Sequence, residues 1–116
     1  MLFLEYPPCS TCKNARKWLE EHGAAFTARH IKGNNPTYEE LKQWHTQSGL
    51  PLKRFFNTSG LAYKALGLKD KLTTMTEEEQ LRLLATDGML VKRPLLITEH
   101  AVLTGFRQAE WENALL

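Results

Sequence analysis

The feature that most constrains this chain is a cysteine pair between an apolar run and an amphipathic segment. Residues 2–6 ("LFLEY") are mostly apolar, and Pro7-Pro8 interrupts that run. Cys9 and Cys12 come next and are the only cysteines among 116 residues. Apolar residues then recur at three- and four-residue spacing over residues 10–22. This order predicts a buried strand, a tight loop and a helix that carries a CxxC motif at its start.

The next segments predict a second strand and an insertion of helices. "AAFTARHI" at 24–31 has the composition of a strand. Thr37 with Glu40, and Thr76 with Glu79, have the spacing of capping boxes, in which each side chain accepts a backbone N–H of the other residue. Each pair predicts a helix start, and a shorter helix is expected between them over residues 59–66.

The end of the chain predicts a β-hairpin and a last helix. "LLIT" and "AVLTG" flank Glu99-His100, and an apolar pattern follows from Ala109 to Leu115. Glu-His is a poor two-residue turn, so a longer loop is expected. The order βαβ, helices, ββα predicts an α/β protein of the thioredoxin plan with a mixed four-stranded sheet. Residues 1–116 are expected to form one domain, with the helical insertion at about 37–90.

Charge and hydropathy narrow the classes of function. The net charge is +2, and basic residues are mixed with acids along the chain, which argues against direct nucleic-acid binding. No run approaches the roughly 20 apolar residues of a membrane span. The first apolar run has no basic leader and no cleavage-site pattern, so it predicts a strand and not a signal peptide. We therefore expect a cytoplasmic protein, in a compartment that keeps thiols reduced.

Three interpretations of the cysteine pair are a metal site, simple packing and redox chemistry. A structural zinc site needs four ligands, and the histidines form no second spaced pair with which to complete one, so no metal is expected. These histidines are His22, His30, His45 and His100. Packing stays open for Cys12, which lies on the apolar stripe of the predicted helix. A CxxC within a βαβ unit favours redox chemistry without a bound cofactor.

Cys9 is placed where its thiolate is favoured. Free N–H groups and the positive end of the helix dipole lie at a helix start. Lowering a thiol pKa by about two units needs about 2.7 kcal/mol, which the helix and one cation can supply together. Lys13 and Arg16 are the candidate cations, and we also expect both to bind an anionic substrate, although Arg16 can turn toward the loop or away from it. Lys17 is expected on a solvated face. We expect Cys9 to be the attacking thiolate and Cys12 the resolving thiol.

With these residues in view, the chain resembles the ArsC/Spx family, the arsenate reductase-like branch of the thioredoxin fold. The resemblance lies in "YPPCSTCKNARKWLEEHG", "FFNTSGLAYKALG", "KRPLLIT" and "LTGFRQAEW". It implies that Cys9 attacks an oxyanion such as arsenate and that Arg93 and Arg107 line the anion site. It also implies a cis peptide bond at Pro94, and glutathione, glutaredoxin or thioredoxin as the electron donor.

Two differences leave two functions open. Glutaredoxin-coupled arsenate reductases have a further arginine whose register here falls near Asn57 or Thr58, with Lys53 and Arg54 upstream. They also lack a cysteine at the position of Cys12. The CxxC is similar to that of Spx, a regulator that binds the C-terminal domain of the RNA polymerase α subunit. The sequence therefore predicts a thiol reductase for a small anionic or thiol substrate, or a redox-sensing regulator of the Spx type.

Overall fold

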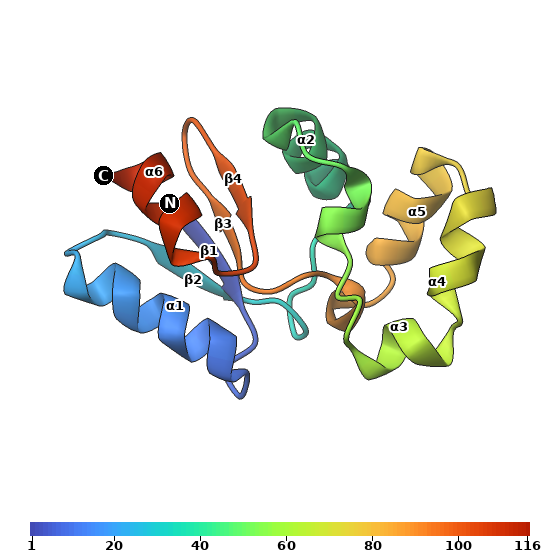
Figure 1. Cartoon of the computed structure of the whole chain (residues 1–116), viewed down its shortest axis with the longest axis horizontal. Coiled ribbons are helices and arrows are strands. Elements are labelled where there is room, and N and C mark those ends of the chain that lie inside the picture. Colours follow the sequence, from blue (N-terminus) through green and yellow to red (C-terminus); the bar gives the residue numbers. More distant parts are fainter.

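The computed structural model describes residues 1–116 and contains one four-stranded sheet with helices on both faces (Figure 1). The strands are β1 (Leu2–Glu5), β2 (Thr27–His30), β3 (Leu95–Ile97) and β4 (Val102–Thr104). Their order is β2-β1-β3-β4. β2 runs parallel to β1, whereas β1 with β3 and β3 with β4 are antiparallel. The predicted mixed sheet is confirmed.

One face of the sheet is covered by the first and last helices. Phe3 of β1 is the partner of Leu96 in β3. Residues paired across two strands point to the same face of the sheet, so both side chains lie on one face. They pack against α1 (Ser10–Glu21) and α6 (Gln108–Leu115), where Trp111 is fully buried. Figure 1 shows both helices beside the strands, at the end of the molecule that carries both termini.

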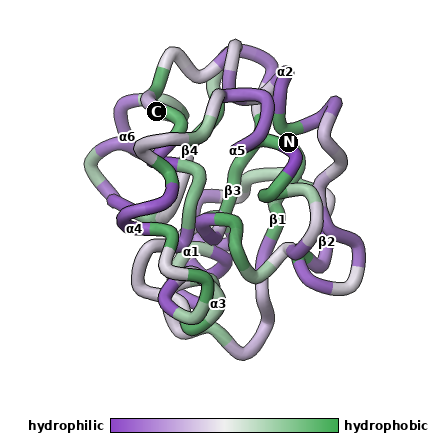
Figure 2. Tube along the Cα trace, turned by 90° about the vertical axis from the view of Figure 1, so that its right-hand side faces the viewer, coloured by the Kyte–Doolittle hydropathy of each residue, from purple (hydrophilic) through white to green (hydrophobic).

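The opposite face carries the helical insertion. Leu4, Leu95 and Val102 point to this side and share one core with the inserted helices. The inserted elements are α2 (Tyr38–Ser48), η1 (Leu52–Phe55), α3 (Leu61–Ala65), α4 (Leu68–Lys71), η2 (Leu72–Thr74), α5 (Glu77–Leu84) and η3 (Gly88–Leu90). Figure 2 shows hydrophobic residues concentrated along β1 and β3 in the middle of the molecule. None of the helices has the length and apolar character that crossing a membrane requires.

Both predicted capping boxes are present. Thr37 and Glu40 exchange hydrogen bonds of 3.0 and 3.1 Å at the start of α2. Thr76 and Glu79 do the same at the start of α5, with the same two distances. These motifs could be predicted because each is complete within four residues.

Some boundaries differ from the prediction. The second strand covers 27–30 only, because Gly23 adopts φ +65° and the chain needs residues 24–26 to return to the sheet. α3 begins at Leu61 and not at 59. Residues 98–101 separate β3 from β4, and the Thr98 N–H donates to the Ala101 carbonyl at 2.8 Å, which leaves only Glu99 and His100 at the tip of the hairpin.

Candidate active site

An open cleft of about 620 Å³ lies where the sheet meets the helical insertion. Four separate segments line it: the start of α1, residues 51–60 of the insertion, residues 92–93 before β3, and residues 104–107 after β4. Cys9, Arg93 and Arg107 all contribute to its wall, so the structure brings these three predicted residues together.

Backbone hydrogen bonds join the middle of the insertion to the segment at its end. The Asn57 N–H donates to the Leu90 carbonyl at 2.8 Å, and the Lys92 N–H donates to the Phe55 carbonyl at 2.8 Å. This short antiparallel pairing brings residues 53–58 next to Arg93. This pairing places Lys53 and Arg54 of the insertion in the same cleft as Cys9 and Arg93.

Cys9 is the N-cap residue of α1 and is half-buried. Its N–H donates to the Tyr6 carbonyl at 2.9 Å, which closes the loop before the helix. Partial burial raises the pKa of the Cys9 thiol, but hydrogen bonds outweigh that effect. They come from the Cys12 N–H and thiol, the Arg93 guanidinium and the Thr11 N–H, and they hold the pKa of Cys9 below its ordinary value. The loop and the helix start therefore favour a thiolate at the cleft.

Cys12 lies behind Cys9 and is fully buried. Its sulfur accepts a weak hydrogen bond from the Tyr6 N–H at 3.5 Å. Burial raises the pKa of Cys12 to about 12, and the Cys9 sulfur adds to the rise. Both cysteines are free thiols. The pair therefore combines an accessible thiol of lowered pKa with a buried thiol that stays protonated.

Arg93 lies beside Cys9 with part of its guanidinium unpaired. Its guanidinium carbon is 5.1 Å from the centre of the Tyr6 ring, and its Nε is buried without a hydrogen-bond partner. The Thr104 hydroxyl, which also lines the cleft, is likewise buried and unpaired. The peptide bond between Arg93 and Pro94 is cis. Two buried polar groups next to the cleft thus have no hydrogen-bond partner within the protein.

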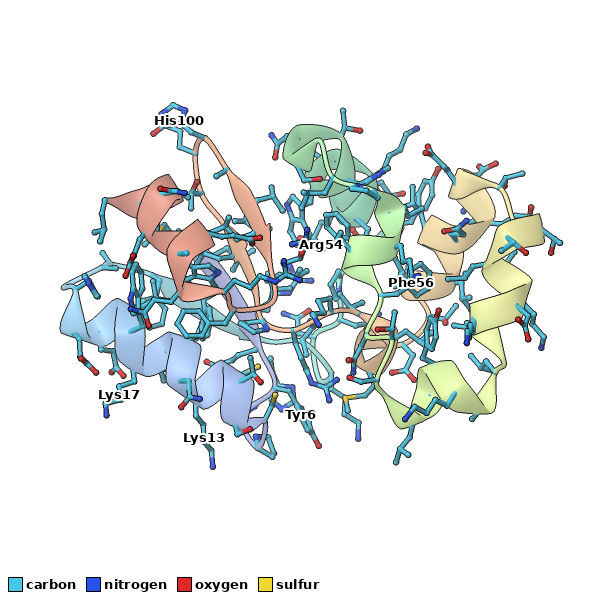
Figure 3. All side chains as sticks on the ribbon, in the orientation of Figure 1. Tyr6, Lys13, Lys17, Arg54, Phe56 and His100 are labelled. Atoms are coloured by element: carbon cyan, nitrogen blue, oxygen red, sulfur yellow. The ribbon has the colours of Figure 1, made fainter.

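Two further arginines meet at a carboxylate that the sequence analysis did not single out. Glu110 of α6 lies 3.5 Å from the Arg54 Nη2 and 3.6 Å from the Arg107 Nη1. Figure 3 shows Arg54 between the insertion and the sheet. The three-residue spacing of Arg107 and Glu110 at a predicted helix start signalled the second pair. Only the tertiary structure shows that Arg54 reaches the same carboxylate.

The cleft wall is polar at the position where glutaredoxin-coupled arsenate reductases have their further arginine. Asn57 and Thr58 both line it, and the two cations upstream, Lys53 and Arg54, line it as well. Lys92, which the sequence analysis passed over, adds a further positive charge from the neighbouring segment before β3. The wall formed by the insertion is therefore cationic although its arginine lies upstream of the expected register.

Lys13 and Arg16 do not line the cleft, although we expected them in the anion site. Figure 3 shows Lys13 on the outer face of α1, pointing away from the molecule. Arg16 turns to β1 and forms an ion pair with the buried Glu5, with 3.2 Å between Nε and Oε1. Its guanidinium also lies 5.5 Å from the centre of the Phe26 ring. The negative charge that compensates Arg16 is thus a carboxylate of the fold itself.

No group of three or more His, Cys, Asp or Glu side chains is close enough together to hold a metal ion.

Residues 4–114 match the ArsC family. The chain belongs to the ArsC family. It is 52% identical over 113 residues to the uncharacterized protein YusI of Bacillus subtilis, which covers 97% of this chain and 96% of YusI. It is 30% identical to the regulatory protein MgsR and 27% identical to the global transcriptional regulator Spx, both of Bacillus subtilis. These matches cover 95% and 90% of this chain, and 86% and 78% of those proteins.

Solved structures of ArsC-family proteins have the same fold. An ArsC family related protein from Bacteroides fragilis superposes with a TM-score of 0.94 and 62% identity, over 97% of this chain and 94% of that one. A protein from Streptococcus mutans UA159, described as a possible arsenate reductase, superposes with a TM-score of 0.90 and 46% identity. That match covers 98% of this chain and 97% of the other. The thioredoxin-like fold of this ArsC-family protein is therefore established over the whole domain.

Proposed function

We propose that this ArsC-family protein is a thiol–disulfide oxidoreductase in which Cys9 attacks the substrate and Cys12 resolves the adduct. The observation that supports it most directly is the contrast between the two thiols at a cationic cleft. Cys9 has a lowered pKa and lines the cleft, whereas Cys12 is buried with a pKa of about 12. A thiolate is the nucleophilic form of cysteine, so the pair has a fixed order of attack.

The reaction proceeds in two steps. With arsenate, the Cys9 sulfur bonds to arsenic as an oxygen leaves as water. The Cys12 thiol then loses its proton and attacks the Cys9 sulfur, which forms the Cys9–Cys12 disulfide and releases arsenite, with arsenic reduced by two electrons. Glutathione, glutaredoxin or thioredoxin restores the dithiol, so no bound cofactor is needed. Arg93 stabilises the Cys9 thiolate and the bound oxyanion.

The test is arsenate-dependent NADPH consumption by the reduced protein. It is coupled in parallel to glutathione with glutaredoxin and to thioredoxin, with Cys9→Ser and Cys12→Ser as matched variants. We expect turnover that Cys9→Ser abolishes, and in Cys12→Ser an adduct on Cys9 or a dependence on external thiol. Absence of arsenate turnover in both systems contradicts arsenate as substrate, and reaction that persists in Cys9→Ser contradicts the assigned nucleophile.

A second function is favoured by the relatives that are named as regulators. MgsR and Spx match over nearly all of this chain, and the CxxC motif suits a redox switch that gates binding to the RNA polymerase α subunit. The test is the affinity of the reduced and oxidised protein for the isolated C-terminal domain of this polymerase subunit. A regulator binds stoichiometrically in one redox state and shows no turnover. Equal or absent binding in both states removes this function.

A further inference from the structure

The charges around the cleft are more one-sided than those of the chain. Five of the 15 Lys and Arg residues line it, and none of the 13 Asp and Glu residues does. The five are Lys53, Arg54, Lys92, Arg93 and Arg107. A cleft lined by one sign of charge focuses the field and concentrates ligands of the opposite sign. The ligand of this cleft is therefore expected to carry several negative charges.

The cleft is also large for a single oxyanion. Its volume of about 620 Å³ lies within the range of about 300–1,000 Å³ that is usual for organic ligands. An oxyanion of five heavy atoms bound at Cys9 and Arg93 occupies only the end of the cleft formed by the start of α1. The cations of the insertion and of the segment after β4 are left to contact another part of a longer ligand.

The protein itself leaves most of these charges uncompensated. Glu110 is the one carboxylate paired with Arg54 and Arg107, at 3.5 and 3.6 Å, so two positive charges share one negative charge. The Arg93 Nε and the Thr104 hydroxyl are buried without any partner. Buried polar groups in folded proteins are normally hydrogen-bonded, so these two unpaired groups beside the cleft are exceptions.

From this we propose that the cleft binds and reduces disulfides of organic thiols that carry two or more phosphate groups. This proposal rests on the proposed function and names its substrate class. A phosphate group carries a charge of about −1.5 to −2 and three acceptor oxygens, so two or three of them match five cations. The arginine forks suit such oxyanions. A thiol that carries only carboxylates offers about one negative charge for each of these groups.

The reaction balances with the two cysteines alone. The Cys9 thiolate attacks one sulfur of the disulfide, forms a mixed disulfide and releases the first thiolate. Cys12 loses its proton and attacks the Cys9 sulfur, which forms the Cys9–Cys12 disulfide and releases the second thiolate. The protein loses two electrons, the ligand disulfide gains them, and a dithiol reductant restores the protein.

The experiment compares single-turnover rates of the reduced protein with three disulfides. These are coenzyme A disulfide, which carries phosphates; glutathione disulfide, which carries carboxylates; and 2-hydroxyethyl disulfide, which is uncharged. Each rate is divided by the rate of dithiothreitol with the same disulfide, which removes intrinsic reactivity. We expect a preference of about tenfold or more for coenzyme A disulfide over the uncharged one, reduced by added salt.

Variants connect the preference to the cleft. Arg54→Gln and Arg107→Gln should each lower the preference for coenzyme A disulfide about threefold or more. Arg82→Gln is the matched control, because Arg82 lies on α5 outside the cleft and pairs with Glu78, and it should leave the preference unchanged. Cys9→Ser should react with each of the three disulfides at least about 30 times more slowly than the parent protein, because only the buried Cys12 thiol remains.

The outcomes separate this proposal from the proposed function. Cys9-dependent reduction of all three disulfides at similar corrected rates overturns the phosphate specificity and leaves the oxidoreductase function standing. An equally strong preference for glutathione disulfide and for coenzyme A disulfide also overturns the phosphate specificity. No Cys9-dependent reaction with any disulfide or with arsenate overturns the proposed function itself.

Discussion

At pH 8, a variant that keeps only Cys9 should react with an uncharged disulfide at least about 30 times faster than one that keeps only Cys12. The two variants are Cys12→Ser and Cys9→Ser. Serine retains a small hydrogen-bonding group at each position, so the neighbouring sulfur keeps a polar partner. The comparison isolates the effect of the two environments on otherwise identical thiols.

The magnitude follows from the pKa of each thiol. The Cys9 pKa lies below the ordinary value of 9.0, so at pH 8 at least about a tenth of Cys9 is thiolate. The pKa of Cys12 is about 12, which leaves about one thiolate in ten thousand. A thiolate of higher pKa is the stronger nucleophile. With a Brønsted coefficient of about 0.4–0.5, the Cys12 thiolate is intrinsically about 16–32 times more reactive than the Cys9 thiolate. The remaining advantage of Cys9 is about 30- to 60-fold, before the burial of Cys12 is counted.

The assay follows release of thiopyridone from 4,4′-dithiodipyridine between pH 5 and 10. The Cys9 rate should level off at a lower pH than the Cys12 rate, which should still rise at the highest pH. In urea the two variants should react alike, because the difference belongs to the folded protein. Arg93→Gln in the Cys12→Ser background should move the Cys9 profile to higher pH, since the Arg93 guanidinium lowers the pKa of Cys9.

Similar rates for the two folded variants refute the reasoning, and so does faster reaction of Cys12. An Arg93→Gln profile that coincides with its parent contradicts the contact between the guanidinium and the Cys9 sulfur. A matched Arg82→Gln variant controls for the loss of one positive charge far from the cleft.

Two further predictions concern stability. Gly88→Ala should lower the free energy of unfolding by about 1–3 kcal/mol, because its Cβ overlaps the Ile31 carbonyl group; Gly33→Ala, where the new Cβ makes ordinary contacts, should cost less in the same urea titration. Glu40→Gln should cost about 1–2 kcal/mol at pH 7, because Glu40 accepts hydrogen bonds of 2.7 and 2.9 Å from Arg29. Those bonds hold the Glu40 pKa below its ordinary value. The contribution of Glu40 to stability is therefore present at neutral pH and lost as pH falls through its folded pKa. The free energies of unfolding of the two proteins should become equal in acid, and a difference that stays constant with pH contradicts this account.

Local features of the sequence determined much of the fold. Both capping boxes, the strand before Cys9 and the helix after it depend on residues within a few positions of one another. Cys9 could be placed at the positive end of a helix for the same reason. The order of these elements predicted the mixed sheet, and the resemblance of four segments predicted the family, which the comparisons confirm.

The tertiary structure decided which charges face the cysteines. Arg16 is close to Cys9 in the sequence, yet it pairs with Glu5, whereas Arg54 is distant and lines the same cleft as Cys9. A helix position allows a long side chain to turn to either side, and only the packing of α1 on β1 selects one. The sequence by itself thus determined that Cys9 lies at the start of a helix, because that placement depends on neighbours along the chain. The cationic wall opposite Cys9 depends on contacts between four distant segments, which exist only once the core has formed.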